Sequence, residues 1–211
     1  MRRLLAAAVV LAAVGAGAAL WLLRPRDEVT PALPATGPDA LVYATSGFEE
    51  VDALGGARHD YPARTTIAVS RPASGCTVFR WRPLAERLYE WELCAGELRR
   101  FTELHRFFGR EDRRTYRCRP GSSLRTGWRC STDDTTETAR VLASRPGYIR
   151  LETTLRGASE GSGARELWLR PDDTPERIRV ENGNATPSVL GAVNYRERYE
   201  LRLIEPGPSR G

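Results

Sequence analysis

The chain has 211 residues, with 32 basic and 27 acidic side chains and a formal net charge of +5. Four arginines, Arg2, Arg3, Arg24 and Arg26, flank an apolar N-terminus, and residues 27–211 hold 28 basic against 27 acidic side chains. This balance excludes a nucleic-acid-binding protein of the kind that relies on a strongly basic surface, so we expect no nucleic-acid partner.

Residues 4–23 are almost entirely apolar. As an α-helix this segment would extend about 30 Å, which matches the hydrocarbon thickness of a membrane. The sequence therefore predicts an N-terminal transmembrane helix, with residues 1–26 as a single-pass signal anchor that contacts the membrane through residues 4–23. The alternative is a signal peptide cleaved near Ala16-Gly17-Ala18, which would release a secreted protein. The apolar sequence continues beyond that site, which favours the anchor.

Three further regions differ in composition. Residues 27–40 contain three prolines and no periodic pattern, which predicts a proline-rich linker. Residues 41–205 are long enough to bury one hydrophobic core and are the expected folded domain. Residues 206–211 are expected to form a disordered tail.

Apolar and polar side chains alternate with a period of two through much of residues 41–205. Such alternation is typical of antiparallel strands with one face in solvent. The clearest segments are 77–82, 89–93, 149–155, 165–169, 178–180 and 195–203. The sequence predicts an all-β domain, mostly antiparallel, with a curved half-barrel as the expected form of the sheet.

Clusters of Gly, Pro, Asn and Asp predict the turns between these strands. They occur at residues 109–112, 157–163, 171–175 and 181–184. The run at 157–163 is expected to be a mobile hairpin loop. The helix candidates within the domain are two short segments, residues 49–54 and 84–87.

The domain contains four cysteines, Cys76, Cys94, Cys118 and Cys130. Folding the first segment as a hairpin about Ala85 places Cys76 opposite Cys94. The same register pairs Phe79 with Trp91 and Arg80 with Glu90, as stable cross-strand pairing requires.

Folding the chain about Leu124 places Cys118 opposite Cys130. We therefore predict the disulfides Cys76–Cys94 and Cys118–Cys130. A crossed pairing such as Cys94–Cys118 and four free thiols are the alternatives.

The use of cysteine also predicts where the domain lies. The four residues form no C-x-x-C pair and no His-Cys cluster, so they suit disulfides made in an oxidising compartment. We expect the C-terminal domain to be extracytoplasmic and the N-terminus to lie inside the cell.

Two histidines, His59 and His105, are candidates for chemistry. His59-Asp60 resembles an oriented base, and Glu103 and His105 would share one face of a strand. No third ligand accompanies this pair at zinc-like spacing, so we interpret both histidines as ordinary side chains and expect no metal and no cofactor.

Ser159 lies in Gly157-Ala158-Ser159-Glu160-Gly161, which matches the G-x-S-x-G pattern of hydrolases. A nucleophile elbow requires this serine on a sharp strand-to-helix turn. Here the motif leads into a strand-like segment, so we expect no catalytic residue and no enzyme. A hydrolase that uses Ser159, or His105, stays as an alternative.

Aromatic side chains are concentrated in the first half of the domain. The members on the predicted strand faces are candidates to line an apolar pocket: Phe79, Trp81, Tyr89, Trp91 and Phe101. The alternative is that they form the core, because aromatic side chains on a β face are readily buried.

The C-terminal stretch resembles the late strands of LolA/LppX-like lipoprotein-carrier domains. The matching residues are Glu166-Leu167-Trp168-Leu169-Arg170-Pro171-Asp172, then residues 175–178 and 191–199. The resemblance covers about 40 residues and implies a curved sheet around an apolar cavity for acyl chains. The chain lacks the lipobox cysteine and the capping helix of that family.

The organisation of the whole chain also resembles uncharacterised membrane-anchored extracytoplasmic β proteins of high-GC bacteria. We therefore expect a membrane-tethered, non-enzymatic domain that binds an apolar or lipid ligand or a protein of the cell envelope. A purely structural partner of another membrane protein is a further alternative.

Overall fold

The structure is a computed structural model, and it describes residues 40–52, 56–72, 75–107, 110–188 and 191–204. The predicted anchor, the linker before Ala40 and the C-terminal tail lie outside these residues. The described part of the chain contains no helix that is long and apolar enough to cross a membrane.

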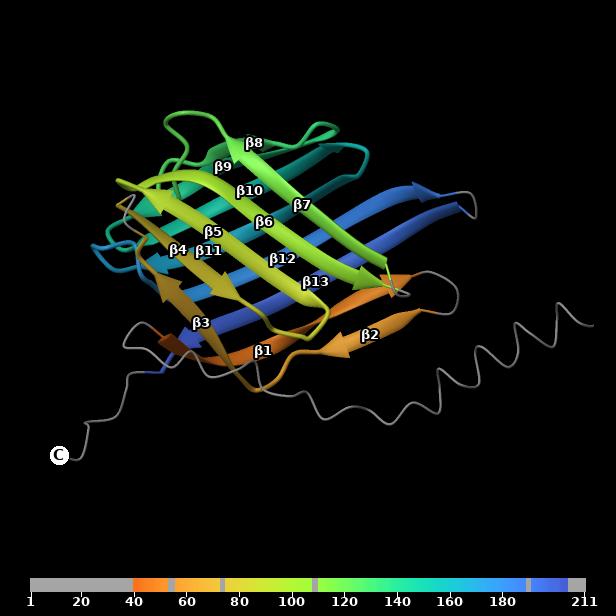
Figure 1. The fold of residues 1–211 in the computed structure, drawn as a ribbon, viewed down its shortest axis with the longest axis horizontal. Helices are drawn as coiled ribbons and strands as arrows, with labels where there is room; N and C mark the ends of the chain where they lie inside the picture. Colours follow the sequence, from red (N-terminus) through yellow and green to blue (C-terminus); the bar gives the residue numbers. More distant parts are fainter. Residues whose placement is uncertain (1–39, 53–55, 73–74, 108–109, 189–190, 205–211) are drawn as a thin grey trace, which may run out of the picture. The chain divides into compact units, whose positions relative to one another are not determined.

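Thirteen β-strands make up the described domain (Figure 1). Each strand from β3 to β12 pairs antiparallel with the next one in the chain, as the alternating sequence predicts. The strands are β1 (Ala40–Asp52), β2 (Ala57–Asp60), β3 (Arg64–Ser70), β4 (Cys76–Trp81), β5 (Arg87–Cys94), β6 (Glu97–Phe107), β7 (Arg110–Cys118), β8 (Trp128–Ser131), β9 (Thr135–Arg145), β10 (Tyr148–Gly157), β11 (Glu160–Leu169), β12 (Pro175–Ser188) and β13 (Gly191–Leu203).

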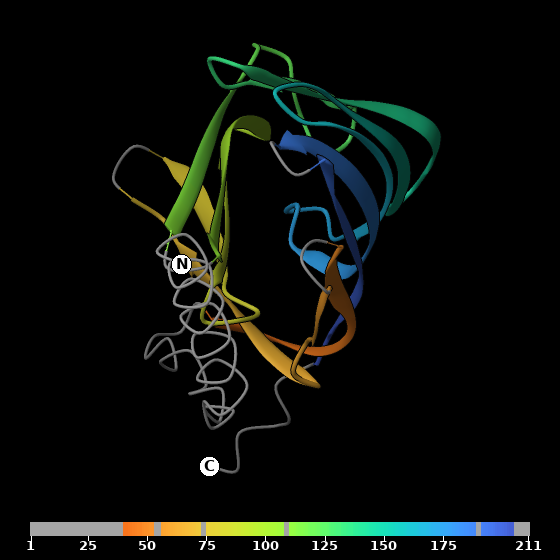
Figure 2. The same cartoon turned by 90° about the vertical axis from the view of Figure 1, so that its right-hand side faces the viewer.

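The first strand closes the sheet. One edge of β1 pairs with β13, from Tyr43 opposite Leu203 to Asp52 opposite Asn194. The other edge of β1 pairs with β3 over residues 40–44 and with β2 over residues 48–51. Twelve strands, β1 and β3–β13, thus form a closed barrel, seen as a ring in Figure 2. The expected half-barrel is corrected to a closed one, in which the last strand pairs with the first and leaves neither edge open.

The hairpin of β4 and β5 has the register that the sequence predicts. All six pairs agree, from Cys76 opposite Cys94 to Trp81 opposite Tyr89. On the outer face, Arg80 forms an ion pair with Glu90 at 2.7 Å. Such exposed pairs contribute at most about 1 kcal/mol each, so the register depends mainly on the buried aromatic face.

Both helix predictions are wrong, since the described residues 49–52 belong to β1 and residues 84–86 form the turn before β5. In β1, Glu49 and its neighbours form backbone pairs with β13 on one side and β2 on the other. These pairings outweigh the weak local preference for a helix.

The turn predicted at residues 109–112 is wrong in part, since residues 110–112 belong to β7. Two other turn predictions are also wrong. Residues 181–184 lie within β12, and the run 157–163 is mostly strand, with only residues 158–159 between β10 and β11. Close packing explains both differences. A side chain at Gly161 would lie 2.3 Å from the carbonyl oxygen of Gly183, and one at Gly163 would lie 2.2 Å from Oδ1 of Asn182. These glycines let β12 approach β11 closely and continue as a strand.

The interior of the barrel has an apolar half and a polar half. Along β13 the inward positions change from Leu201 and Tyr199 to Glu197, and along β6 they change from Phe101 to Glu103. The apolar half holds most of the core, including Ile67, Phe79, Trp81, Leu93, Leu98, Trp128, Leu151, Leu167, Ile178 and Val180. The polar half contains most of the internal space described below.

Candidate functional site

A cavity of about 540 Å³ opens in the polar half of the barrel. Its wall includes Asp52, Glu103, His105, Arg114, Asn184 and Tyr195, which come from β1, β6, β7, β12 and β13. Sites for small molecules commonly enclose about 300–1,000 Å³ and use a few polar groups to orient the ligand. The cavity is therefore the candidate functional site of the domain.

Four glutamates project into the polar half, and the protein supplies partners for three of them. Glu49 forms an ion pair with Arg87, and the two side chains are only 3% and 1% exposed. The other oxygen of Glu49 lies 3.1 Å from Nδ1 of His59. This hydrogen bond favours the protonated imidazole and raises the pKa of His59.

Glu197 is held by hydroxyl groups. The hydroxyls of Tyr61 and Tyr89 both donate to Oε1 of Glu197, at 2.5 and 2.6 Å. Burial raises the pKa of both tyrosines, so they remain neutral donors.

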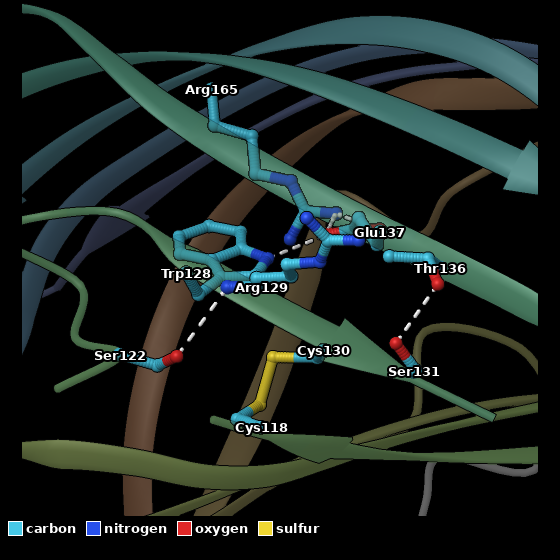
Figure 3. The surroundings of a disulfide bond; sticks show 9 residues. All are labelled: Cys118, Ser122, Trp128, Arg129, Cys130, Ser131, Thr136, Glu137 and Arg165. Atoms are coloured by element: carbon cyan, nitrogen blue, oxygen red, sulfur yellow. Dashed lines mark hydrogen bonds and ion pairs between the residues drawn. A yellow bond between two sulfur atoms is a disulfide. The ribbon is translucent and has the colours of Figure 1, made fainter. Parts of the chain in front are cut away.

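Glu137 lies on β9, close to the Cys118–Cys130 disulfide (Figure 3). Its carboxylate accepts a hydrogen bond from Nε1 of Trp128 at 2.8 Å. It also accepts bonds from Nη2 of Arg165 at 3.1 and 3.2 Å. These donors satisfy a charge that would otherwise be costly to bury.

Glu103 differs from the other three. Within the described part of the chain, its carboxyl group makes no hydrogen bond or ion pair, although it lines the cavity. Burial, followed by the negative charge of Glu137, raises its pKa to about 7, while the positive charge of Arg165 acts in the opposite direction. Near neutral pH, Glu103 is therefore divided between its neutral and charged forms.

Aromatic rings surround this carboxyl group. Tyr89 lies directly opposite Glu103 in the β5–β6 register. The ring of His105, two residues along β6, is 6.4 Å from the ring of Tyr89 and 6.0 Å from the ring of Tyr195. The pairing of Glu103 and His105 on one face, noted from the sequence, thus places both groups at the cavity.

Ser159 also lines the cavity, and it lies in the two-residue connection between β10 and β11. It is 2% exposed, and its hydroxyl lies 2.8 Å from Oγ1 of Thr186 and 3.1 Å from Nη1 of Arg114. A guanidinium and a hydroxyl are not general bases, so these contacts do not activate the serine as a nucleophile. The two hydrogen bonds instead connect the β10–β11 turn to Thr186 on β12 and to Arg114 on β7, at the mouth of the barrel.

The five aromatic residues proposed for an apolar pocket lie in the barrel interior. The rings of Trp81 and Tyr89 are stacked 5.3 Å apart, and Tyr89 and Trp91 are stacked 6.1 Å apart. Phe79, Trp91 and Phe101 line a small apolar space of about 50 Å³. Tyr89 contributes its hydroxyl to the polar half through Glu197.

Both predicted disulfides are confirmed. Cys76 is bonded to Cys94, and Cys118 is bonded to Cys130. The two cysteines of each pair lie directly opposite each other on neighbouring antiparallel strands. The two bonds indicate an oxidising, extracytoplasmic environment.

Among the described residues, potential metal-ligating atoms converge at one place, formed by Cys76, Glu92 and Cys94. The two sulfur atoms are already joined in a disulfide and are not available as thiolates. The carboxyl groups at the cavity do not form such a cluster in this part of the chain.

Sequence reasoning identified only part of the cavity. The alternation of residues 195–203 puts Glu197 on the same face as Tyr199 and Leu201, and a carboxyl group on an apolar face signals a buried polar site. Glu49 and Arg87 were missed because both fall in segments predicted to be helical. The sequence around Glu137 does not indicate that its side chain is buried and bonded, because its partners come from β8 and β11.

Comparison of the chain with protein-family models, with curated proteins and with solved structures finds no match.

Proposed function

We propose that the barrel is an extracytoplasmic ligand-binding domain whose cavity receives a small polar or amphiphilic molecule. The observation that carries this proposal is the cavity of about 540 Å³, lined by charged and hydroxyl groups, next to a closely packed apolar core. A wall built from many strands holds such groups in fixed positions, which favours binding of a ligand with a defined shape.

A binding role fits this arrangement better than hydrolysis. Ser159 faces the guanidinium of Arg114, and the nearest histidine of the cavity wall, His105, is on a different strand and packs against tyrosine rings. A nucleophile needs a base within hydrogen-bonding distance, and the hydrogen bonds of Ser159 to Arg114 and Thr186 supply none among the described residues.

The apolar or lipid ligand expected from the sequence is a second candidate. The aromatic side chains Phe79, Trp91 and Phe101 support it, because they border the apolar space of about 50 Å³. That volume equals only about two water molecules. A lipid acyl chain would therefore have to displace side chains, whereas a small apolar group attached to a polar ligand would fit with little change.

We further propose that residues 4–23 tether the barrel to the cell membrane and that the ligand or an envelope protein reaches it from outside the cytoplasm. The apolar length of this segment supports the tether, and the disulfides support the compartment.

The test is to fill the cavity by mutation. Val193 lines the cavity, and Val193→Trp would occupy part of its volume, while Arg198→Trp places the same side chain at an exposed position of the same strand. Native mass spectrometry of the full-length chain, purified from the envelope in detergent, would detect a co-purified small molecule. We expect the molecule with the natural protein and with Arg198→Trp, and its loss with Val193→Trp. Equal retention by both variants would contradict binding in the cavity.

A further inference from the structure

We propose that the cavity selects an organic cation, such as a protonated amine, and that Glu103 is the residue that pairs with it. This inference rests on the proposed ligand-binding function and names the chemical class of the ligand. It follows from comparing the partners of the four interior glutamates.

Glu49, Glu137 and Glu197 are each satisfied by donors of the protein itself, namely Arg87, Arg165 with Trp128, and two tyrosine hydroxyls. Glu103 has no such donor within the described part of the chain, and it lines the cavity of about 540 Å³, which is large enough for a small ligand. Glu103 is partly buried in the cavity wall. A carboxylate that loses solvent without gaining a donor is unfavourable, so a bound cation would supply what the protein lacks.

The charges around the cavity also favour a cation. Arg87, Arg114 and Arg165 already form ion pairs with Glu49, Asp112 and Glu137. Three acidic side chains remain without a basic partner among the described residues: Glu103, Glu197 and Asp52. This excess of negative charge attracts cations toward the mouth and disfavours anions.

The neighbouring aromatic groups suit an ammonium ion. The ring of Tyr195 lines the cavity, and it already lies 4.8 Å from the guanidinium carbon of Arg87. Tyr116 is a further aromatic side chain of the cavity wall. A carboxylate next to aromatic faces combines an ion pair with cation–π attraction, which is a common way to bind organic ammonium groups.

A metal cation is a poorer fit. Calcium takes six to eight oxygen ligands, and magnesium demands close octahedral geometry. Within the described residues, no three carboxylate or imidazole groups at the cavity converge, so a divalent metal would lack most of the side-chain ligands that it needs. A single carboxylate matches a monovalent ammonium ion.

The test compares three probes of one shape: benzylammonium, benzyl alcohol and benzoate. Binding to the full-length chain in neutral detergent is measured at pH 8 by isothermal titration calorimetry. We expect benzylammonium to bind, and the other two to bind at least about tenfold more weakly. Glu103→Gln should weaken benzylammonium binding by about tenfold or more, and the control Glu90→Gln, at the Arg80 ion pair on the outer face of the barrel, should leave it unchanged.

The outcomes separate this inference from the proposed function. If benzyl alcohol or benzoate binds as well as benzylammonium, and Val193→Trp removes that binding, the cavity binds ligands but the cation selectivity is wrong. If Glu103→Gln folds with a normal melting curve and binds benzylammonium unchanged, Glu103 is not the anchor. If none of the three probes binds, this inference is wrong as well, and the envelope-purification experiment with Val193→Trp then decides the proposed function by itself.

Discussion

Glu103 and Arg114 lie directly opposite each other on β6 and β7, yet they do not form an ion pair. Arg114 instead contacts Asp112 at 3.1 Å and the hydroxyl of Ser159 at 3.1 Å. Cross-strand neighbours of opposite charge usually pair. Because Arg114 is engaged at the mouth of the barrel, the carboxyl group of Glu103 stays available to the cavity.

The first prediction concerns the stability of the free protein. The pKa of Glu103 is raised from 4.5 to about 7 on folding, so the folded state binds the proton more tightly than the unfolded state. Glu103 therefore contributes its full stabilisation of the folded state below pH 4.5. As the pH rises from 4.5 to about 7, the free energy of unfolding falls by about 3 kcal/mol.

Urea unfolding at pH 5 and pH 8 measures this effect. The glutamine variant at position 103 should lose this part of the pH dependence, because its side chain does not titrate. Glu90→Gln, at the exposed Arg80 pair, should retain it. An identical pH dependence in the natural protein and Glu103→Gln would contradict the raised pKa.

The second prediction is the pH dependence of benzylammonium binding. The groups that face Glu103 include Tyr89, His105, Arg114, Glu137, Arg165, Glu197 and Arg87. The cation pairs with the charged form, so binding should be strongest above pH 7 and weaken as the pH falls. At pH 5 about 1% of the Glu103 carboxyl groups are ionised, which corresponds to about 100-fold weaker binding of benzylammonium than at high pH. Calorimetry between pH 5 and 9 would show this trend, and stronger binding at pH 5 would mean that neutral Glu103 acts as a donor instead.

The third prediction concerns two glycines of the β11–β12 pair. Gly163→Ala would bring its Cβ to 2.2 Å from Oδ1 of Asn182 and 2.6 Å from the carbonyl oxygen of Glu181. We expect it to lower the free energy of unfolding by about 2 kcal/mol or more. Gly183→Ala has its nearest neighbour at 3.8 Å and should be tolerated. Thermal unfolding of both variants makes the comparison, and similar melting temperatures would argue against close packing here.

Much of the fold follows from the sequence, for reasons that particular residues make clear. The β4–β5 register is predictable because sulfur, charge and aromatic partners all align in one pairing, such as Phe79 with Trp91. Barrel closure is not predictable in this way. It depends on the pairing of β1 with β13, which are separated by most of the domain, and the polar residues of β1 give no alternation that marks it as a strand.

The cavity was harder to predict than the strands. Asn182-Gly183-Asn184 has the composition of a turn, but in the barrel it passes over the glycines of β11 and becomes part of the cavity wall. The raised pKa of Glu103 depends on Glu137 and Arg165, which come from distant strands. Local patterns carry no information on such contacts.

The fourth prediction concerns Ser159. Its hydroxyl is buried and bonded to Thr186 and Arg114, so Ser159→Ala should lower the free energy of unfolding by about 1 kcal/mol. Ser162→Ala, at an exposed position of the adjoining strand β11, is the control. The natural protein should also resist labelling by a fluorophosphonate, and rapid labelling at Ser159 would revive the hydrolase alternative.

The fifth prediction concerns the Cys118–Cys130 disulfide, which supports the wall beside Trp128 and Glu137 (Figure 3). Replacing both cysteines by serine should lower the free energy of unfolding by about 3 kcal/mol. Denaturant unfolding of this variant would measure the effect, and unchanged stability would contradict a structural role for the bond.

The most direct measurement is an NMR titration of the Glu103 side chain, using protein labelled with carbon-13 at the glutamate carboxyl groups and the Glu103→Gln variant to assign the signal. In the free protein we predict a pKa near 7. With saturating benzylammonium the pKa should fall, because the bound cation favours the carboxylate. A free-protein pKa close to 4.5, or a pKa that does not change when benzylammonium is added, would contradict Glu103 as the anchor of a cationic ligand.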